Sequence, residues 1–237
     1  MVSDFKHPAL EERKINKTSI IIIGGERGLC GGFNQELHNY ISKQIKKFNI
    51  EKQELYVIGQ KPIKYLQSQN ISITKEYPTL NINELNPKLF LLANELYEEF
   101  KNRKTDNIKI IYTSYISSVK HPIVNFQLLP ITEKQNLFSE KNNDLEEKKN
   151  GNILSKPDFY PSPEKIFDNI LPRYMYNSIL KAVLESVAAE QCSRMVAMTS
   201  ATDRANEKLE SLELELNRSR QAQITQEINE VVAGSES

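Results

Sequence analysis

The chain of 237 residues lacks tryptophan and contains only two cysteines, Cys30 and Cys192. Two thiols so far apart cannot form a disulfide framework, which excludes a small disulfide-stabilised scaffold and favours a reducing compartment. Long apolar runs are also missing. The longest aliphatic stretch is residues 20–23, whereas a membrane-spanning helix needs about 20 apolar residues. We therefore expect a soluble protein, or one that reaches a membrane only through other subunits.

Net charge is absent as well, because 31 Lys and Arg residues balance 31 Asp and Glu residues. Without an overall basic field the chain is not expected to bind nucleic acid, and any membrane association is expected to be indirect. The three histidines and two cysteines form no pair with metal-ligand spacing, so neither a metal nor a cofactor is predicted. The hydrophobic content of 39% is sufficient for a packed core.

Glycine is scarce, yet five of the eight glycines fall within residues 24–32, a segment that we call the glycine turn. A β-branched run before it predicts a buried strand, and Asn34 after it is a candidate cap for a helix. Backbone amides in such a turn can bind phosphate, or the glycines can serve a structural turn with positive φ and close packing. The spacing matches neither a Walker A loop nor G-x-G-x-x-G, which favours the structural turn. Its assigned residues are Gly28, Cys30, Gly31 and Gly32.

Cys30 also has two interpretations. A thiol at the start of a helix can be activated as a nucleophile. A catalytic cysteine needs a base, however, and none of the three histidines lies in a motif with an acid or serine partner. A small buried thiol that packs beneath the turn is favoured, and no catalytic residue is predicted.

Apolar patterns in the first half of the chain alternate between the short period of strands and the longer period of helices. This alternation predicts an α/β fold, a Rossmann-like domain with a mixed sheet whose last two strands form a hairpin. We expect extended segments at residues 18–23, 55–58, 71–77, 107–115 and 121–130, and helices at 34–48, 62–67 and 87–104. The expected organisation is a stub at 1–17, the α/β domain at 18–131, a charged flexible loop at 132–158 and a helical region at 159–237.

The helical region begins with a short docking helix at 159–171 and continues as one very long helix. Residues 173–233 contain neither glycine nor proline, and a helix of this length would reach roughly 90 Å. Apolar residues recur within it at the 3-4 spacing of a coiled-coil seam, flanked by charges that suit a solvated rod. The seam requires a partner helix from a stub, another chain or a segment outside this sequence. Its members are Met195, Met198, Thr202, Ala205, Leu209, Leu212 and Leu216.

Polar residues interrupt the seam near the end of this helix. Arg220 and Gln221 either lie on an ordinary solvated face or contact a partner protein that receives the end of the helix. Ile224, Ile228 and Val231 then form a second short apolar stripe suited to an apolar sleeve. Both interpretations remain open.

Three segments resemble one protein family. RGLCGGFN at residues 27–34 is similar to the glycine turn of the gamma subunit of F-type ATP synthases. SRMVAMTSATDRANE at 193–207 and NRSRQAQITQEINEVVAG at 217–234 resemble the C-terminal helix of that family. Residues 170–190 are similar to the family's preceding helical segment, so the resemblance spans nearly the whole chain.

The resemblance implies a central rotor stalk that has no catalytic residues and couples proton flow to ATP synthesis or hydrolysis. Its implied partners are the alpha and beta subunits, the epsilon subunit and the ring of c subunits. The implied location is the cytoplasmic side of a bacterial membrane, with an organellar inner membrane as the alternative. In this family a long N-terminal helix runs antiparallel to the C-terminal helix, whereas this sequence opens in the segment after it. The long helix is therefore expected to be half of an antiparallel coiled coil.

Two functions of other classes remain open. The chain could be a small α/β nucleotide-binding enzyme with a helical oligomerisation arm, which micromolar nucleotide binding dependent on Gly28 and Gly31 would support. It could also be a coiled-coil adaptor unrelated to ATP synthesis, which a pull-down without alpha or beta subunits would support.

We expect Leu209→Asp or Leu212→Asp to lower the melting temperature of a complete rotor that includes the N-terminal helix. Either substitution places a charge in the apolar seam opposite the partner helix. Thermal unfolding of the assembled rotor measures this effect. If both variants melt like the parent, the assignment of the coiled-coil seam is wrong.

Overall fold

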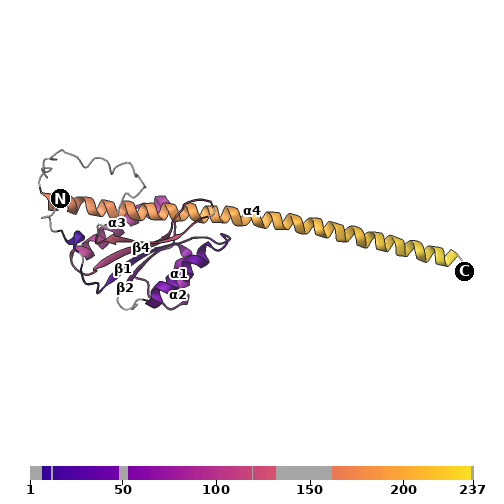
Figure 1. Cartoon of the computed structure of the whole chain (residues 1–237), viewed down its shortest axis with the longest axis horizontal. Helices are drawn as coiled ribbons and strands as arrows, with labels where there is room; N and C mark the ends of the chain where they lie inside the picture. Colours follow the sequence, from indigo (N-terminus) through magenta and orange to yellow (C-terminus); the bar gives the residue numbers. More distant parts are fainter. Residues whose placement is uncertain (1–6, 12, 48–52, 119, 132–161, 236–237) are drawn as a thin grey trace, which may run out of the picture.

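The computed structural model describes residues 7–11, 13–47, 53–118, 120–131 and 162–235. It confirms the predicted fold class, a mixed five-stranded sheet with helices on both faces and one very long C-terminal helix. This helix, α4 (Pro163–Ser235), runs along the sheet domain and then projects far beyond it (Figure 1). The predicted loop at 132–158, residues 1–6 and 12 of the stub and residues 159–161 lie outside the described residues.

The sheet has the strand order β3-β2-β1-β4-β5. Its central strand β1 (Thr18–Ile23) pairs in parallel with β2 (Gln53–Ile58) and β4 (Asn107–Thr113), and β3 (Lys75–Tyr77) extends the parallel part beyond β2. β5 (Ile123–Leu129) is the antiparallel hairpin partner of β4, as predicted. A strand buried on both faces needs a continuous apolar run, which the isoleucines of β1 supply.

The isoleucines of β1 divide the core into two layers. Ile20 and Ile22 pack in the cluster beneath α1 (Phe33–Lys47) and α2 (Gln60–Ser68). The two odd-numbered isoleucines of the strand belong to the larger core that α3 (Ile82–Lys101) and α4 form on the other face. Helices therefore cover both faces of the sheet, and among the helices of the described residues only α4 continues far past it (Figure 1).

Three helices begin earlier than expected, and the starts of α3 and α1 have a visible cause; α2 begins at Gln60 and not at residue 62. α3 begins at Ile82, and not at residue 87, because the Asn81 side chain accepts a hydrogen bond from the Asn83 N–H at 3.1 Å and caps the helix. α1 begins at Phe33, so Asn34 is inside the helix and not its cap. The Asn34 amide instead donates to the Arg27 carbonyl at 3.2 Å and holds the glycine turn.

The expectation of a separate docking helix at 159–171 is wrong, because residues 163–171 belong to the same unbroken helix as the long segment after them. Pro172 lies inside α4 and removes one backbone donor. The apolar face on both sides of this proline is buried in the same core, with Leu171 2% exposed and Met175 fully buried. This packing offsets the lost hydrogen bond and keeps α4 continuous.

We expect Gly59→Ala to lower the free energy of unfolding by about 2 kcal/mol or more. Gly59 has a φ of 104°, and a β-carbon there would lie 2.3 Å from the carbonyl oxygen of Gly24. Urea unfolding measures the change. Gly28→Ala is the matched control, because its β-carbon would meet only the Lys61 Nζ, at 3.7 Å. Equal losses in both variants would contradict this explanation.

Candidate functional site

The glycine turn lies against α4 at the point where this helix leaves the sheet domain. Ala189 and Glu190 are the last buried residues of α4 along the described chain. Every residue from Thr199 to Val231, the segment that we call the shaft, is exposed. The contact between the glycine turn and α4 is therefore the last contact that the described part of the sheet domain makes with this helix before the helix becomes exposed.

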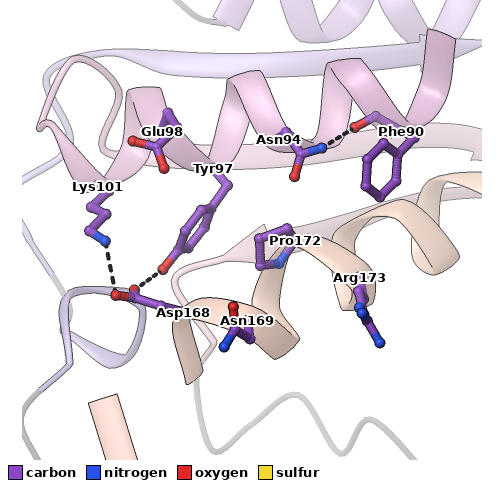
Figure 2. A pocket seen from close by; sticks show the side chains of 9 residues that line it. All are labelled: Phe90, Asn94, Tyr97, Glu98, Lys101, Asp168, Asn169, Pro172 and Arg173. Carbon is purple, nitrogen blue, oxygen red and sulfur yellow. Dashed lines mark hydrogen bonds and ion pairs between the residues drawn. The ribbon is translucent and has the colours of Figure 1, made fainter. Parts of the chain in front are cut away.

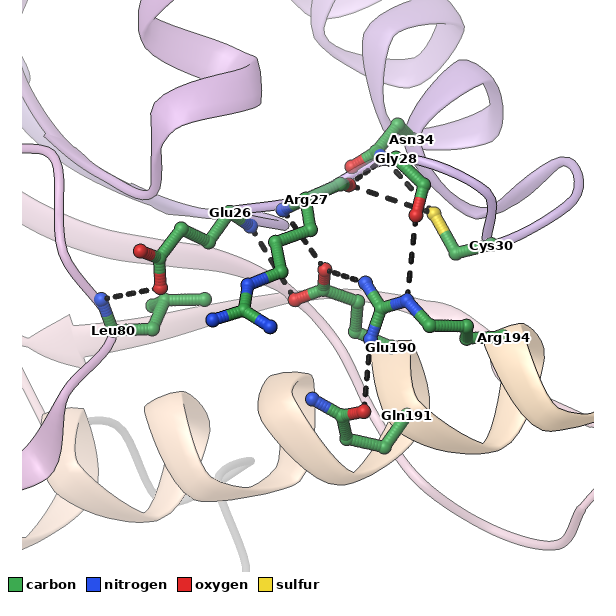
Figure 3. Close-up of polar contacts among 9 residues, drawn as sticks. All are labelled: Glu26, Arg27, Gly28, Cys30, Asn34, Leu80, Glu190, Gln191 and Arg194. Atoms are coloured by element: carbon green, nitrogen blue, oxygen red, sulfur yellow. Dashed lines mark hydrogen bonds and ion pairs between the residues drawn. The ribbon is translucent and has the colours of Figure 1, made fainter.

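The carboxylate of Glu190 is at the centre of this contact (Figure 3). One oxygen accepts a hydrogen bond from the Glu26 N–H at 3.3 Å, and the other accepts one from the Arg27 N–H at 3.1 Å. The side chain of Glu190 is only 4% exposed, and its charge is balanced by Arg194, whose Nη2 lies 2.6 Å away. A buried carboxylate with these partners has its hydrogen-bonding capacity satisfied.

Arg194 adds a second connection to the turn. Its Nε donates to the carbonyl oxygen of Gly28 at 3.3 Å, while its Nη1 donates to the Gln191 side chain at 2.8 Å (Figure 3). Side chains from α4 thus satisfy two backbone donors and one backbone acceptor of the glycine turn.

This geometry bears on the two interpretations of the glycine turn. A phosphate loop would present free backbone amides to its ligand. Here the amides of Glu26 and Arg27 are already bonded to Glu190 of the same chain. The carboxylate of Glu26 also lies nearby and accepts from the Leu80 N–H at 3.3 Å, so a phosphate would meet negative charge. The arrangement favours a structural turn.

The residues assigned to the turn are brought together beside α4. Gly31 has a φ of 57°, the left-handed region that glycine adopts at no steric cost. A β-carbon at Gly31 would lie 3.8 Å from that of Ala197, one helical turn beyond Arg194. The turn therefore follows α4 over about two helical turns, from Glu190 to Ala197.

Cys30 is buried beneath the turn, 2% exposed, and packs against Phe33 and Ala189. The Asn34 amide donates to its Sγ at 3.0 Å. Burial raises the pKa of the Cys30 thiol, and the negative charge of Glu190 raises it further. A thiol that stays protonated is a poor nucleophile, which supports the packing role.

The predicted seam and the predicted contact residues occupy the exposed part of α4. All seven seam residues, from Met195 to Leu216, are exposed, and Leu209 retains 58% of its accessible surface. Arg220 and Gln221 make no side-chain hydrogen bond or ion pair within the described part of the chain. Apolar side chains repeated along a solvated helix require a covering partner.

A pocket of 310 Å³ lies between α3 and the first turns of α4 (Figure 2). One of its four charged lining residues is Asp168, which accepts from Tyr97 Oη, from Lys101 Nζ at 2.9 Å and from His7 Nε2 at 3.4 Å. These hydrogen bonds, that of Tyr97 first, lower the pKa of Asp168. Through the bond from His7 this carboxylate anchors the stub to α4, while 36% of the Asp168 side chain stays exposed.

Sequence reasoning missed Glu190 and Arg194. A helical period in the sequence is the signal that could have found them. Val183, Ser186 and Ala189 recur every three residues on the buried face of α4, and Glu190 continues that face. A carboxylate at an apolar position indicates a buried partner, and the partner four residues later is Arg194.

Comparison with known proteins gives consistent results. The family model described as ATP synthase matches residues 1–237. The chain is 35% identical over 234 residues to the ATP synthase gamma chain of Histophilus somni (strain 129Pt), covering 98% of this chain and 78% of the relative. It is 34% identical over 233 residues to the ATP synthase gamma chain of Haemophilus influenzae (strain PittEE), with the same coverage.

The fold is also similar to a solved structure. A chain of the Euglena gracilis mitochondrial ATP synthase, described as OSCP/F1/c-ring in rotational state 3, matches with a TM-score of 0.63 and 17% identity. The match covers 98% of this chain and 79% of that chain. At this identity the likeness concerns the fold alone.

We expect Cys30 to be alkylated by iodoacetamide more slowly than the partly exposed Cys192. The raised pKa of Cys30 lowers its thiolate fraction at a given pH, so its rate should rise only above the pH range of an ordinary thiol. Mass spectrometry of Cys30→Ala and Cys192→Ala, each with one remaining thiol, measures the two rates. A Cys30 that reacts as fast as Cys192 would contradict the packing role.

Proposed function

Because this chain belongs to the ATP synthase gamma-chain family, we propose that it is the central rotor stalk of a rotary ATP synthase. In this role the chain has no catalytic residues of its own. It couples proton flow through the membrane ring to ATP synthesis or hydrolysis in the alpha and beta subunits.

The exposed shaft is the observation that carries this proposal. Its 33 residues from Thr199 to Val231 form a rod of about 50 Å. One side of the rod carries the apolar seam and the other sides are mainly polar or charged. An asymmetric rod presents a different face to each of several equivalent binding sites, and these unequal contacts shift their conformational populations. Rotation of the rod would then change the state of each site in turn.

The glycine turn supports a non-catalytic role. The amides that a nucleotide phosphate would need are bonded to Glu190, and the pKa of the Cys30 thiol is raised. These contacts weaken the alternative of a nucleotide-binding enzyme.

We assign the partners by region. The seam from Met195 to Leu216 pairs with an antiparallel helix of the same rotor, because its exposed apolar side chains need cover. The sheet domain contacts the epsilon subunit and the ring of c subunits, while the end of α4 enters the hexamer of alpha and beta subunits.

The protein's location follows from the complex. No helix in the part of the chain that the structure describes is both long and apolar enough to cross a bilayer. We propose peripheral attachment through the ring, on the cytoplasmic side of a bacterial membrane.

At the end of the helix, Arg220, Gln221, Ile224 and Ile228 are the proposed contacts with the hexamer. All four are exposed, with Ile224 at 46% and Ile228 at 57%. A guanidinium and an amide can bind carboxylates or carbonyls of a partner, and the isoleucines can enter an apolar sleeve.

Reconstitution tests the proposal. An affinity-tagged chain, produced with its host's other ATP synthase subunits, should co-purify with alpha and beta subunits and support ATP-driven proton pumping in vesicles. Complexes that lack the chain are the control. Absence of alpha and beta subunits from the purified material would favour the adaptor. Micromolar nucleotide binding by the isolated chain, lost on substitution of Gly28 and Gly31, would favour the enzyme.

We expect Arg220→Ala combined with Gln221→Ala to reduce ATPase turnover of the complex more than it reduces the stability of the rotor. Charge-assisted hydrogen bonds shielded from water contribute about 1.5 to 3 kcal/mol each. Arg204→Ala, which changes another exposed arginine nearer the sheet domain, is the control and should change turnover little. If the double variant and the control have equal effects, Arg220 is an ordinary surface residue.

A further inference from the structure

We propose that Glu190 is a positioning residue that fixes the rotational register of the shaft in the sheet domain. The inference rests on the proposed rotor function and adds the part of the molecule through which torque passes. Glu190 contacts no substrate and acts through the glycine turn.

The position of Glu190 along α4 is the first argument. Glu190 is 3% exposed and is the last buried residue of the helix within the described part of the chain. A load on the exposed shaft therefore reaches the sheet domain first through the segment from Glu190 to Ala197. The outermost attachment of a rod carries the largest share of a load applied beyond it.

The kind of bond is the second argument. Residues earlier in α4, such as Val183, are held mainly by apolar packing, which is non-directional. The hydrogen bonds that Asp168 and Glu185 make to the sheet domain reach only side chains, which can follow a small rotation of the helix. Hydrogen bonds depend on direction, and those of Glu190 reach the backbone amides of Glu26 and Arg27. These hydrogen bonds fix the rotation of α4 about its own axis relative to the backbone of the glycine turn.

Arg194 and Gly31 extend this attachment along the helix. Arg194 joins the Glu190 carboxylate to the carbonyl oxygen of Gly28, as Figure 3 shows. One helical turn further, a β-carbon at Gly31 would be 3.8 Å from that of Ala197. The glycine turn thus bonds to α4 through Glu190 and Arg194 and lies close to it at Ala197, which resists rotation of the helix better than a single contact.

The chemistry of substitution gives a sharp test. Glu190→Gln keeps the size of the side chain but replaces one acceptor oxygen by an NH2 donor. In either orientation of the glutamine amide, this NH2 group faces a backbone N–H, that of Glu26 or that of Arg27, so two donors meet and one hydrogen bond is lost. We therefore expect Glu190→Gln to weaken the contact with the glycine turn nearly as much as Glu190→Ala does. Glu185→Gln is the matched control. The Glu185 carboxylate accepts from the Ser114 hydroxyl at 2.7 Å, and a hydroxyl can donate to or accept from an amide.

Hydrogen exchange of the full chain tests the contact without reference to any function. The amides of Glu26 and Arg27 should exchange about tenfold faster or more in Glu190→Ala and Glu190→Gln. The amides of β1 report global stability and should change less. Glu185→Gln should leave the turn as it is in the parent. Unchanged exchange of both amides in the Glu190 variants would overturn the inference.

Proton pumping by the assembled complex tests the coupling role. Glu190→Ala should lower the protons pumped per ATP hydrolysed by about twofold or more, at a normal content of alpha and beta subunits. A disulfide between Gly31→Cys and Ala197→Cys offers rescue, because 3.8 Å is the usual distance between bridged β-carbons. In a background of Cys30→Ala and Cys192→Ala, oxidation should restore the pumping ratio and reduction should abolish it.

The outcomes separate the two proposals. If the parent complex itself does not pump protons, the rotor function fails, while hydrogen exchange still decides whether Glu190 holds the turn. If the parent pumps and Glu190→Ala pumps equally well per ATP, the positioning role is overturned. A disulfide verified by mass spectrometry that fails to restore pumping also overturns it, provided that the same disulfide leaves pumping normal in a chain that keeps Glu190, because a cysteine at the φ of 57° of Gly31 is strained.

Discussion

The buried carboxylate of Glu190, bonded to two backbone amides of the glycine turn, is the interaction on which the arrangement of this molecule depends. Before it, α4 is part of the sheet domain and packs through residues such as Met175 and Ile179. Beyond it, the helix soon becomes fully exposed. The same carboxylate fills the position that an anion would take in a phosphate loop. One side chain therefore attaches the shaft and removes the most obvious ligand site.

The second constraint is the apolar seam along the shaft. Large side chains such as Leu209 and Leu216 retain 58% and 68% of their accessible surface, and a solvated helix gains nothing by repeating them at coiled-coil spacing unless a partner covers them. The family membership and the seam lead to the same proposal, an antiparallel shaft that is completed by a second helix. The sheet domain then serves as the wide base of a narrow rod.

Sequence patterns predicted the fold correctly in segments where one hydrophobic period, that of a strand or that of a helix, was clear. The isoleucine run of β1 was assigned its exact bounds, and the absence of glycine after Pro172 predicted the long helix. The start of α3 was missed because the Asn81 cap, and not the more visible Pro87, determines it. The separate docking helix was wrong because tertiary packing on both sides of Pro172 outweighs the cost of one missing hydrogen bond.

The site was less accessible to sequence reasoning. The glycine turn was recognised, but its partner lies more than 160 residues away in α4, and no local pattern connects the two. Glu190 looked like an ordinary charged residue of a helix. Only its place on the face shared by Val183 and Ala189 distinguishes it, and the importance of that face depends on what packs against it.

Single-molecule rotation tests the central claim most directly, namely that the sheet domain and the shaft turn as one body inside a catalytic hexamer. A bead would be attached to a cysteine introduced at the exposed Lys120, in a chain without Cys30 and Cys192, with the hexamer anchored to a surface. We expect ATP to drive rotation in one direction with three stops in each turn. A bead that stays still, or drifts without stops while ATP is hydrolysed, would contradict the account.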